Sequence, residues 1–189
     1  MKDSMRSSSL ATRWQVITGA PCSGKTTLIQ AFAQRGHRVV PETARAYIDL
    51  CLAQGMTLSQ IKADPLKFER KILLEKVALE TALPRDRLTF MDRAVPDSVA
   101  YYRFEGLDPA EPLRHSRTVR YETIFLLERL AFEQDAVRSE DADGAARLEA
   151  MLAECYEALG YSVVRVPVMG IDERTGFILR HLCRKAAHL

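Results

Sequence analysis

Residues 14–28 read WQVITGAPCSGKTTL, and this stretch decides the fold. Four of its first five residues, all but Gln15, are apolar or β-branched, and this run stops at Gly19, which predicts a short buried strand. From Ser23 to Gln34 the pattern predicts a helix. Between them lies GAPCSGKT, a complete G-x-x-x-x-G-K-T motif. A glycine-rich loop that connects a strand to a helix in this way predicts a phosphate-binding loop.

Each fixed position of this loop has a physical reason. Gly19 and Gly24 allow backbone angles and close approaches that a Cβ would block. The N–H groups converge on a phosphate at a helix start, where the helix dipole also favours an anion. Lys25 is expected to reach the β- and γ-phosphates, and the Thr26 hydroxyl to bind Mg²⁺. The predicted nucleotide-binding residues here are Gly19, Ala20, Pro21, Cys22, Ser23, Gly24, Lys25, Thr26 and Thr27.

The alternative is a chance match, which a chain of this composition produces on the order of once in a hundred. The flanking strand and helix argue against it. Cys22 leaves two interpretations open: a small side chain at a variable position, or a thiol made reactive by the helix start. The four cysteines show no C-x-x-C or Cys/His ligand spacing, which favours a reduced, zinc-free protein.

Short apolar strands alternate with helices along the rest of the chain. This alternation predicts an α/β fold, a parallel sheet covered on both faces, with the ligand beyond the carboxyl ends of the strands. The predicted strands are Trp14–Thr18, Arg38–Pro41, Leu88–Met91, Thr123–Leu127 and Ser162–Val168. The predicted helices are Ser23–Gln34, Thr43–Ala53, Asp64–Leu83, Pro96–Phe104, one that ends at Gly160, and Asp172–Ala187.

Length and composition limit the class of protein. A chain of 189 residues is expected to form one domain, here residues 13–189, after a polar, serine-rich leader of residues 1–12. No apolar stretch is long enough for a transmembrane helix or resembles a signal peptide, which predicts a cytoplasmic protein without a membrane span. The 27 basic and 25 acidic residues nearly balance, so charge favours no nucleic-acid partner. A homodimer is left open.

Two further strand ends carry candidate catalytic residues. Asp92 directly follows the third predicted strand, at its carboxyl end, where a carboxylate would hold Mg²⁺ and its water shell; a capping Asp is the alternative. The next residue is Arg93, where a motor-type ATPase usually carries a water-orienting Glu. An arginine suits an anion and cannot accept a proton, so transfer to an acceptor is favoured over hydrolysis. Glu42 follows the second strand and is predicted to take a proton from an acceptor hydroxyl; stabilising the next helix start is the alternative.

The charged segment 128–143 lies between the fourth and fifth predicted strands. A solvated loop is the ordinary interpretation. In this position, however, it is predicted to be a lid at about 129–143 that closes over the phosphates and supplies Arg129 or Arg138 to the transition state. A second basic cluster, residues 114–120, is interpreted as a solvated face or a weak anion site.

The stretches GAPCSGKTT, VVPETARAY, FMDRAVPDSVAYYR and EQDAVR together resemble the NadR/TRPL-translocation-defect AAA-type P-loop family. The resemblance runs from about Arg13 to the C-terminus. It implies a nucleoside- or nucleotide-kinase-like fold with strand order 2-3-1-4-5, an ATP or GTP site at residues 19–27, and Asp92 near Mg²⁺. The lid of this family usually reads D-G-x-R, whereas this chain has Ala136 in place of the glycine.

Two functions from different classes follow. The first is a kinase that transfers the γ-phosphoryl group of ATP-Mg²⁺ to a hydroxyl of a small nucleoside-like acceptor, with Lys25, Glu42, Asp92, Arg93 and Arg138 as catalytic residues. The second is an ATP- or GTP-dependent switch with no small-molecule acceptor. A guanine-reading N-K-x-D motif is absent from the sequence, so ATP is favoured. A nucleic-acid-driven motor is disfavoured by the charge balance and by Arg93.

Overall fold

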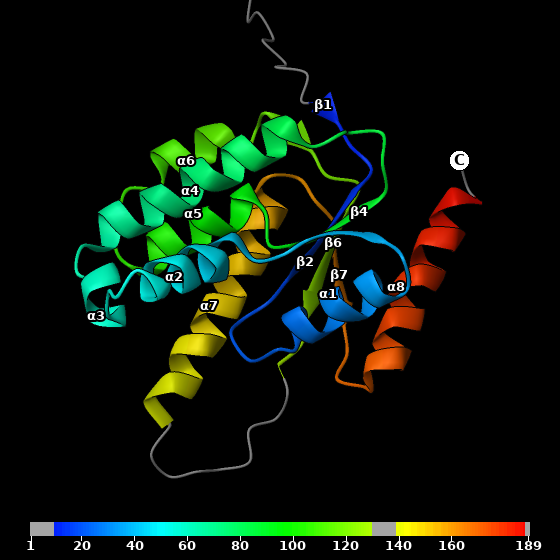
Figure 1. Cartoon of the computed structure of the whole chain (residues 1–189). Coiled ribbons are helices and arrows are strands. Elements are labelled where there is room, and N and C mark those ends of the chain that lie inside the picture. Colours follow the sequence, from blue (N-terminus) through cyan, green and yellow to red (C-terminus); the bar gives the residue numbers. More distant parts are fainter. Residues whose placement is uncertain (1–9, 130–138, 188–189) are drawn as a thin grey trace, which may run out of the picture.

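A five-stranded parallel sheet forms the centre of the chain (Figure 1). The structure is a computed structural model that describes residues 10–129 and 139–187. The sheet order is β3-β4-β2-β6-β7, which is 2-3-1-4-5 when these five strands are numbered along the chain, so the predicted strand order is confirmed. The strands are β2 Trp14–Thr18, β3 Arg38–Val40, β4 Thr89–Asp92, β6 Thr123–Leu127 and β7 Val163–Val166.

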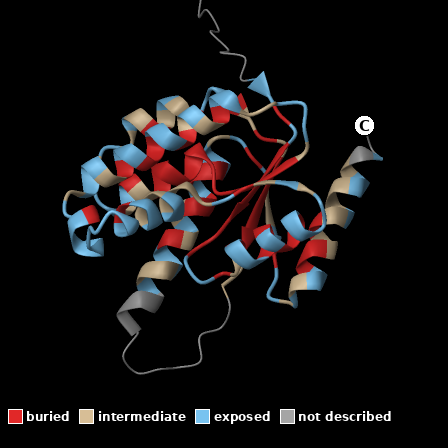
Figure 2. Ribbon diagram, viewed as in Figure 1, coloured by how far each residue is buried: buried red, intermediate tan, exposed pale blue. Residues whose placement is uncertain are grey.

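Helices cover both faces of this sheet, as the alternating sequence predicts (Figure 1). On one face α1 and α8 pack against the strands, and on the other face α4, α5 and α7 do so. The buried residues accordingly concentrate in the sheet and on the helix faces turned toward it (Figure 2). The helices are α1 Lys25–Gln34, α2 Thr43–Ala53, α3 Leu58–Ile61, α4 Pro65–Ala82, α5 Val95–Phe104, α6 Ala110–His115, α7 Ser139–Ala158 and α8 Ile171–Ala186.

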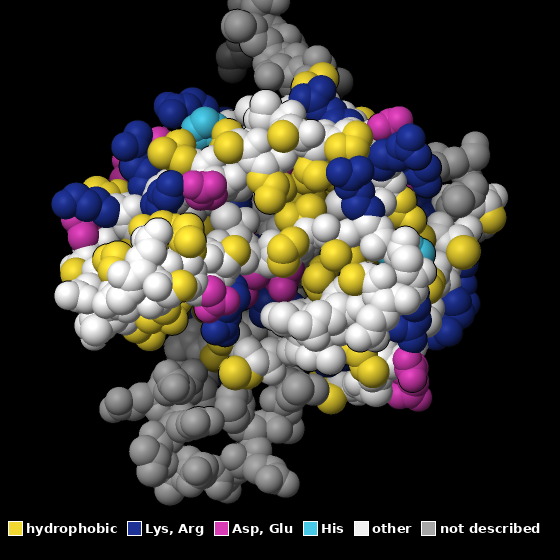
Figure 3. Space-filling view, in the orientation of Figure 1, with side chains coloured by type: hydrophobic (Ala, Val, Ile, Leu, Met, Phe, Trp, Pro, Cys, Tyr) yellow, Lys and Arg dark blue, Asp and Glu magenta, His cyan; other side chains and the backbone are white. Residues whose placement is uncertain are grey.

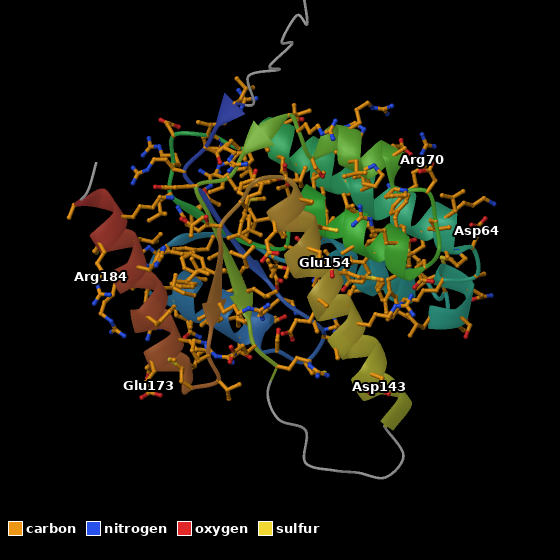
Figure 4. All side chains as sticks on the ribbon, turned by 180° about the vertical axis from the view of Figure 1, so that it is seen from behind. Asp64, Arg70, Asp143, Glu154, Glu173 and Arg184 are labelled. Atoms are coloured by element: carbon orange, nitrogen blue, oxygen red, sulfur yellow. The ribbon has the colours of Figure 1, made fainter. Side chains whose placement is uncertain are left out.

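From behind, α7 and α8 flank the sheet, with Glu154 of α7 and Arg184 of α8 on the outside (Figure 4). Among the described residues no helix is both long and apolar enough to cross a membrane.

Two segments differ from the sequence-based expectation. Leu10–Ala11 of the expected leader form a short strand, β1, which pairs in parallel with β5 (Val119–Arg120) through backbone hydrogen bonds. Ser139 to Asp143 of the expected lid belong to α7, so the segment between β6 and α7 is shorter than predicted. Polar residues at a helix start have no apolar period, and the boundary therefore escapes a pattern-based prediction.

Candidate functional site

The glycine-rich loop, residues 19–27, leaves β2 and leads into α1 as the motif predicts. Gly19 and Gly24 both have positive φ angles, of 146° and 84°. A Cβ on Gly19 would lie 2.8 Å from the backbone oxygen of Leu127, so only glycine fits there. Cys22 also adopts a left-handed conformation, with φ at 60°, and its side chain is exposed. The loop thus adopts the backbone conformation that the motif predicts for a phosphate-binding loop.

Lys25 folds back over this loop. Its Nζ donates to the backbone oxygen of Ala20 at 2.8 Å and lies 3.2 Å from Ser23 Oγ. Burial lowers the pKa of Lys25 to about 8, and the nearby charge of Arg93 acts in the same direction. The neighbouring Thr26 is exposed at the first turn of α1. The start of α1 therefore carries the buried amino group of Lys25 next to the exposed hydroxyl group of Thr26.

Asp92 ends β4, directly beside Ile17 of β2 in the strand register. It is 2% exposed, and its Oδ1 has no hydrogen-bond partner among residues 10–129 and 139–187. Burial, with the charge of Glu42 adding to it, raises the pKa of Asp92 to about 6. A buried carboxylate oxygen that accepts no hydrogen bond is unfavourable unless a bound ligand or cation interacts with it. Together with the Thr26 hydroxyl, hard oxygen donors of this kind fit Mg²⁺ bound alongside phosphate.

Arg93 and Glu42 form an ion pair beside Asp92. Arg93 Nε donates to Glu42 Oε1 at 2.9 Å, and the arginine side chain is 4% exposed. Burial acts to raise the pKa of Glu42, but the charge and hydrogen bond of Arg93 outweigh burial and lower it. The backbone of Arg93 is left-handed, with φ at 66°, and its N–H donates to Ile17 at 3.0 Å. This strained turn aims the guanidinium back across the ends of the strands.

Asp97 connects these parts, and sequence reasoning assigned it no role. It is fully buried and accepts from Thr18 Oγ1 at 2.6 Å, from Tyr156 Oη at 2.5 Å and from the N–H of Ala94 at 3.0 Å. Arg93 Nη1 lies 3.3 Å away. One carboxylate thus links β2, just before the glycine-rich loop, to α5, α7 and the Arg93 side chain. The D-R-x-x-P-D spacing places it one turn into α5, which is the signal that could have found it.

Arg174 is the second residue that the sequence did not reveal. From α8 it donates to three backbone oxygens: Ser23 at 2.6 Å, Glu128 at 3.1 Å and Pro167 at 3.1 Å. A Cβ on Gly24 would lie 3.3 Å from its Nη1, so the guanidinium lies against the loop itself. The arginine fastens the glycine-rich loop to the segments after β6 and β7. A single arginine in a helical pattern carries no sequence signal for this role.

The predicted lid residues are only partly placed. Arg129 Nε lies 3.6 Å from Glu149 Oε2 of α7, so this arginine has an acidic neighbour in the structure. Arg138 lies outside the described residues. In the basic cluster 114–120, Arg120 donates to Leu159 and its guanidinium lies 3.8 Å from the centre of the Tyr161 ring. Arg120 is therefore a packing residue rather than part of an anion site.

The remaining predicted residues come together. Lys25, Thr26, Glu42, Asp92 and Arg93 all lie at the carboxyl ends of β2, β3 and β4 or at the helix starts that follow. Charged side chains of both signs gather in the hollow between α2 and α1 (Figure 3). The arrangement can hold a phosphate chain on the loop, a cation at Asp92 and a polar molecule beside Glu42 and Arg93.

Comparison with known proteins agrees with this geometry. A family model described as an AAA domain matches residues 14–174. No curated protein matches the sequence. Thymidylate kinase from Ehrlichia chaffeensis is similar in structure, with a TM-score of 0.65 and 12% identity over 91% of this chain and 98% of that one. Deoxyadenosine kinase from M. mycoides has a TM-score of 0.58 and 14% identity over 90% and 98%.

A third similar structure is the NadR protein in complex with NR. It has a TM-score of 0.64 and 17% identity and covers 84% of this chain. This chain spans 44% of the NadR chain. At these identities the likeness shows a common fold, the nucleoside-kinase-like arrangement that the motifs imply.

Proposed function

The chain belongs to the AAA domain family, and on that premise we propose that it is a kinase that transfers the γ-phosphoryl group of ATP to a hydroxyl of a small nucleoside-like acceptor. The observation that carries the proposal is the Arg93–Glu42 ion pair next to the glycine-rich loop. In this proposal the acceptor would meet the terminal phosphate beside this pair, so that a negatively charged carboxylate and an arginine would both contact the reacting groups. The kinases with the same fold support this proposal.

Phosphate binding would rest on the loop and Lys25. The N–H groups at the start of α1 favour an anion, and the ammonium group would exchange its contact with Ala20 for the β- and γ-phosphates. Mg²⁺ would be held by Thr26 and Asp92, and when bound it neutralises charge on the phosphate oxygens. The Oδ1 of Asp92, which no described residue hydrogen-bonds, fits this role.

Glu42 would orient the attacking hydroxyl. Its Oε1 accepts from Arg93, which leaves Oε2 for the acceptor. The hydroxyl oxygen forms the new bond to the γ-phosphorus, the bond to the bridging oxygen of ADP breaks, and the hydroxyl proton passes to Glu42. A carboxylate with a lowered pKa is a weak base, yet phosphoryl transfer is largely dissociative and needs positioning more than proton abstraction. Arg93 and Lys25 would stabilise the transferring charge.

A panel of acceptors tests this proposal. Purified full-length protein with ATP and Mg²⁺ is assayed for ADP release with nucleosides, nucleotides and related alcohols, one at a time. We expect one acceptor class to accelerate ADP release at least about 100-fold over buffer, because binding energy of the acceptor is used to position it. Lys25→Ala should abolish both ATP binding and turnover. Equal ADP release with every acceptor would contradict the kinase assignment.

A nucleotide-dependent switch is the second candidate. The matching family is described only as an AAA domain, which names no acceptor, and this is the observation in its favour. Tight ATP or GTP binding with negligible turnover under every acceptor would support it. Retention of nucleotide binding by Lys25→Ala would contradict both functions.

A further inference from the structure

Helix α4 buries three ionisable side chains on one face. Glu69, Lys76 and Glu80 are spaced by seven and four residues, which places them on the same side of a helix. Their exposed fractions are 7%, 4% and 4%. Burying a charge is unfavourable unless a partner compensates it, so each of these residues needs a structural or functional reason.

Two of the three have structural partners. Glu80 accepts from the N–H of Val95 at 3.0 Å and from Tyr121 Oη at 2.8 Å, so it caps the start of α5. Lys76 Nζ lies 3.2 Å from Ser98 Oγ, and the negative charge of Asp97 acts on it. These contacts account for both side chains as parts of the α4–α5 packing.

Glu69 has no such partner. Among residues 10–129 and 139–187 it accepts no hydrogen bond and forms no ion pair, although more than nine tenths of it is buried. Burial raises the pKa of Glu69, which means that the charged carboxylate is less favourable in the folded protein than in water. A residue that destabilises the free protein in this way is typical of a ligand-binding position.

Glu69 shares its charged surroundings with the Arg93–Glu42 pair. The charges of Lys76, Glu105, Lys62 and Arg93 act on it, in decreasing order, and the charges of Glu69 and Glu42 both act on Tyr101. Helix α2, which follows Glu42, packs against α4 through Phe68, whose ring lies 6.2 Å from that of Tyr47. Helix α4, which carries Glu69, thus packs against α2 through Phe68 and against α5 through the Lys76–Ser98 contact, so Glu69 lies on an element that borders the helix following Glu42.

The charges in this region disfavour a phosphorylated acceptor. Arg93 is already paired with Glu42 and Asp97, and Lys76 is bonded within the α4–α5 packing. A phosphate group on the acceptor would be repelled by the carboxylates of Glu42 and Glu69, whereas the buried cations Arg93 and Lys76 already have partners within the protein. Hydroxyl or amine groups, in contrast, would donate to those carboxylates.

We propose that Glu69 accepts hydrogen bonds from the acceptor and selects hydroxyl compounds without a phosphate, such as free nucleosides, over the corresponding monophosphates. This inference rests on the proposed kinase function and names its acceptor class. Glu69 is a specificity-determining residue in this view, remote from the transferred phosphoryl group. Arg45, an exposed arginine one turn after Glu42 on α2, is the residue that would serve a phosphorylated acceptor instead.

The test compares each nucleoside with its 5′-monophosphate. Wild-type protein should show a higher kcat/KM with the nucleoside. Glu69→Gln should raise the KM for that nucleoside about 10- to 100-fold, the usual effect of losing a hydrogen bond to a charged group, and leave kcat within about 3-fold. Glu75→Gln is the matched control, because Glu75 lies on the same helix, is exposed and pairs with Lys71. It should leave both constants unchanged.

Direct binding separates this inference from the kinase assignment. Calorimetry with a non-hydrolysable ATP analogue measures nucleoside affinity even if no acceptor is phosphorylated. Weaker nucleoside binding by Glu69→Gln, with an unfolding temperature at or above that of wild type, supports the inference. Equal binding by the variant overturns it. A preference for monophosphates that Arg45→Ala abolishes also overturns it, while leaving the kinase function intact.

Discussion

Arg93 Nε lies 2.9 Å from Glu42 Oε1, so two residues that are 51 positions apart in the chain form an ion pair at the ends of adjacent strands. The pair joins β3 to β4 and lies beside the glycine-rich loop of β2. It holds the Glu42 carboxylate in its charged form and leaves one of its oxygens open. The pair thereby provides both the acid–base group and the anion-binding group of the proposed reaction.

Replacing Glu42 tests whether its carboxylate acts on the acceptor. Glu42→Gln keeps the shape and an acceptor oxygen for Arg93 but removes the negative charge. We expect kcat to fall about 100-fold, the lower end of the range for general bases, with little change in ATP affinity. Steady-state kinetics and ATP titration measure the two effects. Asp49→Asn, an exposed change on α2, the helix that follows Glu42, is the control and should have wild-type kinetics.

Asp92→Asn tests the metal position. We expect Mg²⁺ to bind about 10- to 100-fold more weakly in the presence of ATP. The pKa of Asp92 is about 6 in the folded, metal-free protein, above the ordinary value of 3.8. Between these two pH values the folded protein binds more protons than the unfolded chain, so the folded protein loses stability as the pH rises from about 4 to 6. The variant lacks this loss and should gain roughly 1–3 kcal/mol in unfolding free energy at pH 7. Wild-type Mg²⁺ dependence in the variant would rule out the metal role.

Proton uptake tests Lys25 independently of turnover. Its pKa is about 8 in the free protein, below the ordinary 10.5, and bound phosphate should raise it again. Between these values the folded protein holds fewer protons than the unfolded chain, so the ligand-free protein gains stability as pH rises there. ATP binding should therefore weaken above pH 8 and take up a proton. Calorimetry in buffers of different ionisation enthalpy measures this uptake, and its absence at pH 9 would contradict the assignment.

Arg174→Ala should loosen the glycine-rich loop. The change leaves the backbone oxygens of Ser23 and Glu128 without a donor, which costs about 1–3 kcal/mol in unfolding free energy. We expect weaker ATP binding as well, because the loop is no longer held in its binding shape. Chemical denaturation and ATP titration measure the two effects. Arg180→Ala, an exposed change on α8, should alter neither. Normal ATP affinity in a destabilised Arg174→Ala protein would limit this arginine to a structural role.

Alkylation of Cys22 tests its place in the loop. The thiol is exposed within the glycine-rich loop, so a bulky adduct there should block nucleotide binding, and ATP should protect it. Cys183 is also exposed, and a Cys183→Ser background removes its contribution. Cys22→Gly is the control, since its left-handed backbone suits glycine and the variant should bind ATP after the same treatment. Unimpaired binding by the alkylated protein would show that Cys22 is only a small side chain at a variable position.

Much of the site could be predicted because local patterns encode it. The glycine-rich loop, Glu42 and the Asp92–Arg93 pair each follow a predicted strand, and parallel strands bring their carboxyl ends to one edge of the sheet. The covering helices and the order of the five strands are confirmed. The short β1–β5 pair could not be predicted, since it depends on hydrogen bonds between distant backbone segments. The start of α7 could not be predicted either, because its first residues are mostly polar and carry no apolar period.

The sequence by itself determined the strand–loop–helix unit and the chemical types of the residues that follow each strand, because glycine spacing, apolar period and helix starts are local properties. Only the tertiary structure decided which buried charges meet. Arg174 donates to Ser23 across 151 positions and Thr18 donates to Asp97 across 79, whereas Glu69 accepts no hydrogen bond and forms no ion pair within the part of the chain that the structure describes. These pairings depend on how the helices pack over the sheet. Packing decides whether a buried charge has a partner within the protein or is left for a ligand to compensate, and no local sequence pattern carries that information.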